Sequence, residues 1–157
     1  MIRRAQNVGN LMEDFGLHDD VELVYVTRSY ATRHGAGPFP GEDEAMSFKD
    51  ETNKPNDYQG AMRFGVLNVD NLRLEIGRDM DKIRVPFSPS IAVTCLDQRA
   101  PNFKTGELDC YASNEEFCRE ILADRMNFST AYASLGPKTD SEMKAWSRKG
   151  EPCGCKT

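Results

Sequence analysis

The chain has 157 residues, which is the usual size of one domain. Its net charge is −5, and 29% of its residues are charged. It has no basic block, which argues against a nucleic-acid surface, and no stretch near the roughly 20 apolar residues that a membrane span needs. No signal peptide is visible and the five cysteines are irregularly spaced, so we expect a cytoplasmic protein with reduced thiols.

The first half of the chain alternates predicted elements with a long loop. Apolar residues at helical spacing predict a helix over 2–16, and the β-rich run over 23–27 predicts a buried strand. Residues 35–62 show no periodic element, and a loop of this length inside a domain is often functional. A helix capped by Asn68 is then predicted over 69–80.

The second half continues the alternation of strands and helices. Strands are predicted over 90–96 and 129–134, with a polar loop over 98–112 and a helix over 113–125 between them, and a last short helix is predicted over 140–148. This order is typical of a parallel α/β sheet.

The domain organisation that we expect is one region over residues 1–150 and a flexible tail over 151–157. The tail carries Cys153 and Cys155, whose role stays open. Two thiol ligands do not make a zinc site, so we predict no metal site in this chain.

A glycine-rich stretch over residues 30–42 is the strongest candidate for a binding loop. It reads Tyr-Ala-Thr-Arg-His-Gly-Ala-Gly-Pro-Phe-Pro-Gly-Glu. Glycine lets a backbone approach a ligand closely and proline stiffens the chain. Parallel sheets bind ligands at the carboxyl ends of their strands, and residues 33–41, 97 and 134–137 all follow predicted strands. The alternative interpretation is a stiff surface turn.

Three signatures, in this order, resemble the adenylosuccinate synthetase family. The stretch over 30–42 is similar to the family loop Tyr-x-Thr-Arg-Val-Gly-x-Gly-Pro-Phe-Pro-Thr-Glu. Thr94-Cys95-Leu96-Asp97 is similar to the guanine-recognition motif Thr-Lys-Leu-Asp, and Ser134-Leu135-Gly136-Pro137 resembles a Ser-x-Gly-Pro turn. The resemblance covers residues 17–148 and corresponds to the C-terminal part of a typical member.

The resemblance implies a fold and a chemistry. The expected fold is α/β, a parallel-sheet, P-loop-NTPase-like partial domain with a long loop insertion. The family ligates aspartate to inosine monophosphate, and it uses GTP and Mg²⁺ to phosphorylate the purine oxygen first. The implied partners are therefore guanine and purine nucleotides.

The resemblance also implies site residues. Asp97 would accept hydrogen bonds from the ring N–H and the exocyclic amine of guanine, a strong charged bidentate contact. Ser134 and Gly136 would close around the same base, and Cys95 stands where the family has a lysine along the base and ribose.

The purine monophosphate site would be formed by the glycine-rich stretch. Arg33, His34 and Gly35 would lie at this site, with His34 in place of a family valine near the ribose.

Two departures from the family pattern limit what the chain can do alone. Arg63 is the one basic residue in the segment that resembles the aspartate-binding loop, and the family's two binding arginines fall at Gly60 and Met62, which cannot bind carboxylates in a bidentate manner. A diverged member, such as the phage-type enzymes that act on a deoxyguanylate, fits this pattern. No glycine-rich loop followed by lysine occurs here, so we expect no catalytic residue and no Mg²⁺ ligand in this chain.

The leading hypothesis is a C-terminal part or subunit of a GTP-dependent ligase of this family, acting with a chain that supplies the N-terminal half or as an oligomer. The alternatives are a non-catalytic nucleotide-binding or interaction module and an unrelated α/β domain whose loop matches by chance. For single residues, Arg33 could instead pair with Glu42 or Asp50, and Arg63 could instead anchor its own loop.

Overall fold

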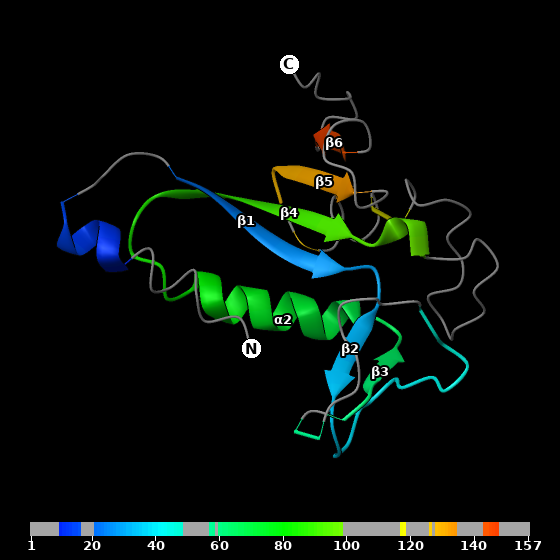
Figure 1. Ribbon diagram of the computed structural model, residues 1–157. Helices are drawn as coiled ribbons and strands as arrows, with labels where there is room; N and C mark the ends of the chain where they lie inside the picture. Colours follow the sequence, from blue (N-terminus) through cyan, green and yellow to red (C-terminus); the bar gives the residue numbers. More distant parts are fainter. Residues whose placement is uncertain are drawn as a thin grey trace.

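The computed structural model describes residues 10–16, 21–48, 57–58, 60–98, 117–118, 126 and 128–134, together with the backbone of 143–147. Its centre is a four-stranded sheet in the order β1-β4-β5-β6, formed by Val21–Arg28, Phe87–Thr94, Thr130–Ser134 and Met143–Ser147. β1, β4 and β5 are parallel, and β6 runs antiparallel to β5. Figure 1 shows these strands above a long helix. The α/β class and the parallel arrangement predicted from the sequence are confirmed at this level.

The long helix α2 (Val69–Met80) forms because its ends and its apolar face agree with a helix. The Asn68 side chain accepts the backbone N–H of Asn71 at 2.8 Å, which satisfies one of the free amides of the first turn. Val69 and Ile76 are buried on the face that meets the sheet. The helix and its cap are therefore as the sequence predicts.

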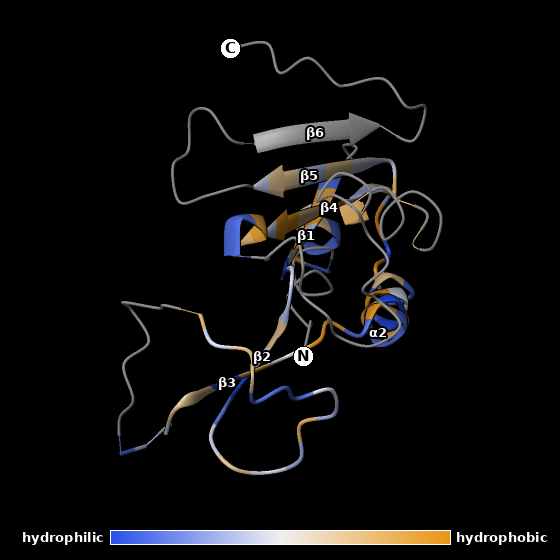
Figure 2. Ribbon diagram, turned by 90° about the vertical axis from the view of Figure 1, so that its right-hand side faces the viewer, coloured by the Kyte–Doolittle hydropathy of each residue, from blue (hydrophilic) through white to orange (hydrophobic). Residues whose placement is uncertain are grey.

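The core lies between α2 and one face of the sheet. The central strand β4 contributes Ile91 and Val93, which are completely buried, and β5 contributes the small residues Ala131 and Ala133. Full burial of an aliphatic side chain stabilises a fold by about 1.5–3 kcal/mol. Figure 2 shows the hydrophobic colouring on the strands and on part of α2. On the outer face of β1, Val24 and Val26 remain exposed.

A buried hydrogen bond joins α2 to the sheet through this core. The Tyr25 hydroxyl of β1 donates to Oδ2 of Asp79 at 2.9 Å, and both residues are about 5% exposed or less. Burial, followed by the neighbouring Asp79 carboxylate, raises the pKa of Tyr25 well above its ordinary value of 10.0. The hydroxyl therefore stays protonated and available as a donor.

The strand β6 corrects the helix predicted over 140–148. Residues 143–147 pair with all five residues of β5 in antiparallel register. A helix of the nine residues predicted would be only marginally stable in isolation, whereas strand β5 offers backbone N–H and C=O groups for pairing at its edge. Tertiary pairing therefore overrides the local helical pattern.

A two-stranded hairpin was also not expected. β2 (Ala31–His34) and β3 (Met62–Gly65) pair in antiparallel register, so the glycine-rich stretch begins as a strand and becomes a loop only at Gly35. In the described parts of 35–61 there is no helix and no strand of more than one residue, in agreement with the predicted loop. Figure 1 shows the hairpin extending from the end of β1, away from the sheet.

The remaining elements agree with the sequence where they are described. The helix predicted over 2–16 is present over 10–14, Phe117 and Cys118 are helical within the one predicted over 113–125, and β4 begins three residues before the predicted strand over 90–96. Residues 15 and 16 form a turn, and residues 2–9, the rest of the helix predicted over 113–125 and the tail over 151–157 lie outside the described residues. Among the described helices, none is long and apolar enough to cross a membrane.

Candidate nucleotide-binding edge

The carboxyl edge of the parallel strands gathers the residues predicted to bind guanine. Ala133 pairs with Val93, so Ser134 at the end of β5 lies next to Thr94 at the end of β4. The chain after β4 turns into the short 3₁₀ helix η1 (Leu96–Gln98), which carries Asp97 and packs against β5. Cys95, Asp97 and Ser134 are thus on one edge, whereas Gly136 lies outside the described residues.

The turn over residues 95–98 presents Asp97 outward. Leu96 is completely buried and anchors the turn in the core, while the Asp97 side chain is exposed. Within the described part of the chain Asp97 makes no side-chain hydrogen bond or ion pair. Cys95 has a φ of +60°, a left-handed conformation that a residue with a side chain seldom adopts. The carboxylate is therefore an exposed acceptor on a strained, anchored turn.

Two consecutive residues at the end of β1 hold this turn. The Ser29 hydroxyl donates to the Cys95 carbonyl at 2.9 Å, and the Tyr30 hydroxyl donates to Oε1 of Gln98 at 2.5 Å. Both residues are buried. Sequence reasoning did not identify Ser29 or Gln98, because each depends on a partner more than 60 residues away.

Tyr30 also belongs to a small aromatic cluster under the hairpin. Its ring stacks on Phe48, with centroids 4.2 Å apart and planes 20° apart, and both rings meet the edge or face of Phe64 on β3. Offset aromatic contacts of this kind add to the burial of the rings. The cluster connects the base of the hairpin to the edge that carries Asp97.

Arg63 on β3 closes the glycine-rich loop over residues 35–42. Its NH1 group donates to the carbonyls of Gly35 and Gly37 at 2.9 Å, and its Nε and NH2 groups donate to the two carboxylate oxygens of Glu42, the Nε contact at 2.5 Å. The guanidinium also lies over the Phe39 ring, 5.6 Å from its centroid. Its fixed fork of donors suits this combination of carbonyls and carboxylate.

The charges of this pair support each other. Hydrogen bonding from Arg63 lowers the pKa of Glu42 below its ordinary value of 4.5, and Glu42 raises the pKa of Arg63. The structure therefore agrees with the interpretation that Arg63 anchors its own loop. With three of its nitrogens in these contacts, Arg63 is not a free donor for the carboxylates of an amino-acid substrate.

The loop also approaches β3 through its backbone. Val66 donates to the Gly41 carbonyl at 2.8 Å, Asp43 donates to Phe64 at 3.0 Å, and a Cβ on Gly65 would lie 2.4 Å from the Gly41 carbonyl oxygen. Only glycine fits at position 65 without displacement of the loop. The loop is thus built onto the hairpin.

The residues predicted to bind a purine monophosphate lie on this hairpin. Arg33 and His34 are exposed on β2, and Arg33 donates to the Ala36 carbonyl at 3.1 Å. Glu42 pairs with Arg63 and not with Arg33, whereas Asp50, the other partner considered for Arg33, lies outside the described residues. No hydrogen bond or ion pair within the described chain joins Arg33, His34 or Gly35 to Asp97 or Ser134. Tyr30 contacts both regions, through Gln98 on the turn that carries Asp97 and through Phe64 on β3.

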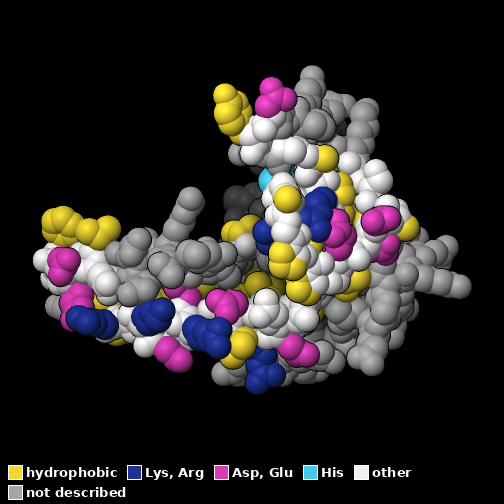
Figure 3. Space-filling view, turned by 90° about the horizontal axis from the view of Figure 1, so that it is seen from below, with side chains coloured by type: hydrophobic (Ala, Val, Ile, Leu, Met, Phe, Trp, Pro, Cys, Tyr) yellow, Lys and Arg dark blue, Asp and Glu magenta, His cyan; other side chains and the backbone are white. Residues whose placement is uncertain are grey.

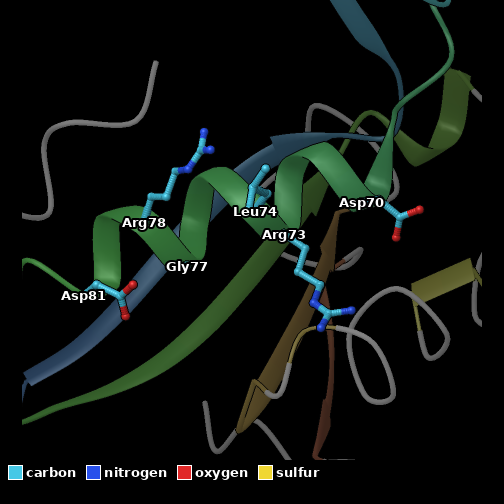
Figure 4. Close-up of a pocket in the computed structure, with 6 residues that line it drawn as sticks. All are labelled: Asp70, Arg73, Leu74, Gly77, Arg78 and Asp81. Atoms are coloured by element: carbon cyan, nitrogen blue, oxygen red, sulfur yellow. The ribbon is translucent and has the colours of Figure 1, made fainter.

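A shallow groove of about 430 Å³ lies elsewhere, along the outer side of α2. It is lined by Leu74 and Gly77 and by charged residues of both signs, and Figure 4 shows Arg73 and Arg78 projecting to different sides of the helix. The space-filling view in Figure 3 shows acidic and basic side chains interspersed on this side of the molecule. None of the predicted site residues lines this groove.

Within the described residues, no group of three or more His, Cys, Asp or Glu side chains is arranged to hold a metal ion. Comparison of the chain with protein-family models, with curated proteins and with solved structures finds no match.

Proposed function

We propose that this chain supplies the guanine-recognition site and part of the purine monophosphate site of an adenylosuccinate synthetase-like, GTP-dependent nucleotide ligase. The observation that carries the proposal is the exposed carboxylate of Asp97 on the turn after β4, at the same edge of the sheet as Ser134 at the end of β5. The carboxyl edge of parallel strands is the usual place for a nucleotide, and an exposed carboxylate there matches the two parallel N–H donors of guanine.

The resemblance of three ordered sequence motifs supports the choice of family, including its P-loop-like fold. GTP would be the phosphoryl donor and Mg²⁺ would neutralise its phosphates. The described residues offer no cluster for that ion, and the 157 residues include no glycine-rich phosphate loop followed by lysine. We propose that a partner chain with the N-terminal half supplies these groups, in a cytoplasmic setting.

The test of guanine recognition is a specificity change at Asp97. Wild-type protein should bind GDP in calorimetry more tightly than IDP, which lacks the exocyclic amine. In Asp97→Asn the new amide would donate to the C2 carbonyl of xanthine, so XDP should become the preferred ligand and GDP affinity should fall roughly ten- to hundredfold. Asp70→Asn, which removes an exposed carboxylate on α2, is the matched control. Equal affinity of the wild-type protein for GDP, IDP and XDP would contradict the proposal.

A second candidate is a non-catalytic nucleotide-binding module. It is favoured by one observation, namely that Arg63 is held by Glu42 and by the loop carbonyls. Release of phosphate from GTP, measured with inosine monophosphate, aspartate and a chain that carries the phosphate loop, separates the two candidates. The ligase requires that release, whereas the module would bind GDP without it.

A further inference from the structure

The junction between β1 and β2 consists of two buried residues, and each holds one end of the turn that carries Asp97. The Ser29 hydroxyl donates to the backbone carbonyl of Cys95, which begins the turn, and the Tyr30 hydroxyl donates to the side chain of Gln98, which ends it. We propose that Ser29 and Tyr30 are positioning residues that set the orientation of the Asp97 carboxylate toward a guanine base. This inference rests on the proposed function.

The turn needs such external support because its own hydrogen bonding is weak. Its internal backbone bond, from Gln98 to the Cys95 carbonyl, is 3.3 Å long, which is the long end of the range for N–H···O bonds. Cys95 is in the left-handed region, where a residue with a side chain is held only when its surroundings determine the conformation. The two hydroxyl contacts and the buried Leu96 side chain hold Cys95 in this conformation.

Tyr30 is itself fixed on the hairpin side. Its ring is stacked on Phe48 and packed against Phe64, so its hydroxyl cannot move without rearrangement of the aromatic cluster. Phe64 lies on β3 next to Arg63, which closes the glycine-rich loop. The aromatic cluster thus lies between the turn that carries Asp97 and the strand that holds the glycine-rich loop.

Bidentate recognition of guanine depends on angle more than a single hydrogen bond does. Loss of the Ser29 or Tyr30 hydroxyl would leave the Asp97 carboxylate in place but let it rotate, so the selectivity for GDP over IDP should fall. A purely structural role predicts a different result, because a less stable protein would bind both nucleotides equally less well. The ratio of the two dissociation constants is therefore the readout that identifies a positioning residue.

The experiment measures GDP and IDP affinity by calorimetry in Tyr30→Phe and Ser29→Ala. We expect the GDP-to-IDP selectivity to fall about three- to tenfold in each. Tyr132→Phe and Ser129→Ala are matched controls, since those hydroxyls bind Glu22 and the Pro89 carbonyl away from the turn. They should keep wild-type selectivity.

Variants at Gln98 test the same contact from its other side. Gln98→Glu retains an acceptor for the Tyr30 hydroxyl and should keep the selectivity, whereas Gln98→Leu should lose as much as Tyr30→Phe. The double variant of Tyr30→Phe and Gln98→Leu should lose no more than either single variant, because both remove the same interaction. Additive losses would overturn the assignment.

The outcomes for the two proposals are distinguishable. Suppose that wild-type protein binds GDP and that Asp97→Asn shifts the preference to XDP, but Tyr30→Phe and Ser29→Ala keep the full GDP-to-IDP selectivity. The positioning role of Ser29 and Tyr30 is then wrong, and the proposal of a guanine site stands. If wild-type protein shows no preference for guanine, both are overturned. Amide hydrogen exchange at residues 96–98 adds a ligand-free check, in which exchange should accelerate in Tyr30→Phe and remain unchanged in Tyr132→Phe.

Discussion

The guanidinium of Arg63 binds both carboxylate oxygens of Glu42, and this contact closes the glycine-rich loop on the hairpin. The same guanidinium holds the Gly35 and Gly37 carbonyls. Arg63 binds the Glu42 carboxylate and two carbonyls at once. Neither Arg63→Lys nor an exchange of Arg63 with Glu42 would therefore reproduce the arrangement.

Acid should loosen the loop through Glu42. The pKa of Glu42 is lowered in the folded state, so the stabilisation is fully present above its ordinary value of 4.5 and is lost as the pH falls through the lower folded value. Hydrogen exchange of residues 35–41 should therefore be steady at neutral pH, after correction for the intrinsic rate, and should accelerate below about pH 4.5.

Two variants test this pH dependence. Glu42→Gln should show fast loop exchange that no longer depends on Glu42 protonation, and exchanging the two residues (Glu42→Arg with Arg63→Glu) should fail to restore protection because glutamate cannot donate to the carbonyls. Arg78→Met, which breaks the exposed pair with Glu75, is the control. Restored protection in the exchanged pair would contradict the role given to the carbonyl contacts.

Two glycines should respond oppositely to the same substitution. A Cβ at Gly65 would meet the Gly41 carbonyl oxygen at 2.4 Å, so Gly65→Ala should destabilise the protein by about 1–3 kcal/mol. A Cβ at Gly77, within α2, would meet nothing within 4 Å, so Gly77→Ala should stabilise it by about 0.5–1 kcal/mol. Urea denaturation measures both, and the same sign for the two would be contrary to the structure.

Removal of the Tyr25 hydroxyl should weaken the contact between the sheet and α2. Tyr25→Phe leaves the buried Asp79 carboxylate without this donor, and we expect a loss of about 1–3 kcal/mol in the free energy of unfolding. Tyr132→Phe, whose hydroxyl is more exposed, should lose less. Equal losses in the two variants would show that the buried hydrogen bond of Tyr25 contributes no more to stability than the exposed one of Tyr132.

Alkaline pH offers an independent test of Tyr25. Its pKa is raised in the folded state, so its contribution is complete below the ordinary value of 10.0 and is lost as the pH rises toward the folded value. The wild-type protein should lose stability above about pH 10 more steeply than Tyr25→Phe does, as followed by chemical denaturation at a series of pH values.

The left-handed backbone of Cys95 predicts an unusual order of stability among variants. Cys95→Gly should be more stable than Cys95→Val by about 1–2 kcal/mol, because a β-branched residue fits poorly at a φ of +60°. At the neighbouring strand residue Thr94 the order should reverse, since valine suits a strand and glycine does not. Thermal denaturation of the four variants would reveal the two orders.

The sequence predicts those elements whose signal is local. The cap and apolar face of α2 and the β-rich runs of β1 and β5 can be recognised from neighbouring residues alone. The position of Asp97 just after a strand is predicted from the same kind of local pattern. β6 and the hairpin did not follow, because both depend on pairing with residues distant in the chain. The contact of Arg63 with Glu42 across 21 residues and that of Tyr30 with Gln98 across 68 are of the same kind.

The direct passage from β1 into β2 restricts the chain length that the protein tolerates. Ser29 and Tyr30 are adjacent in the chain, and each hydroxyl binds its own partner in the turn over residues 95–98. Insertion or deletion of one residue here would break this match and shift the glycine-rich loop by one place. The spacing between the sheet and the hairpin is therefore fixed by these two side-chain contacts.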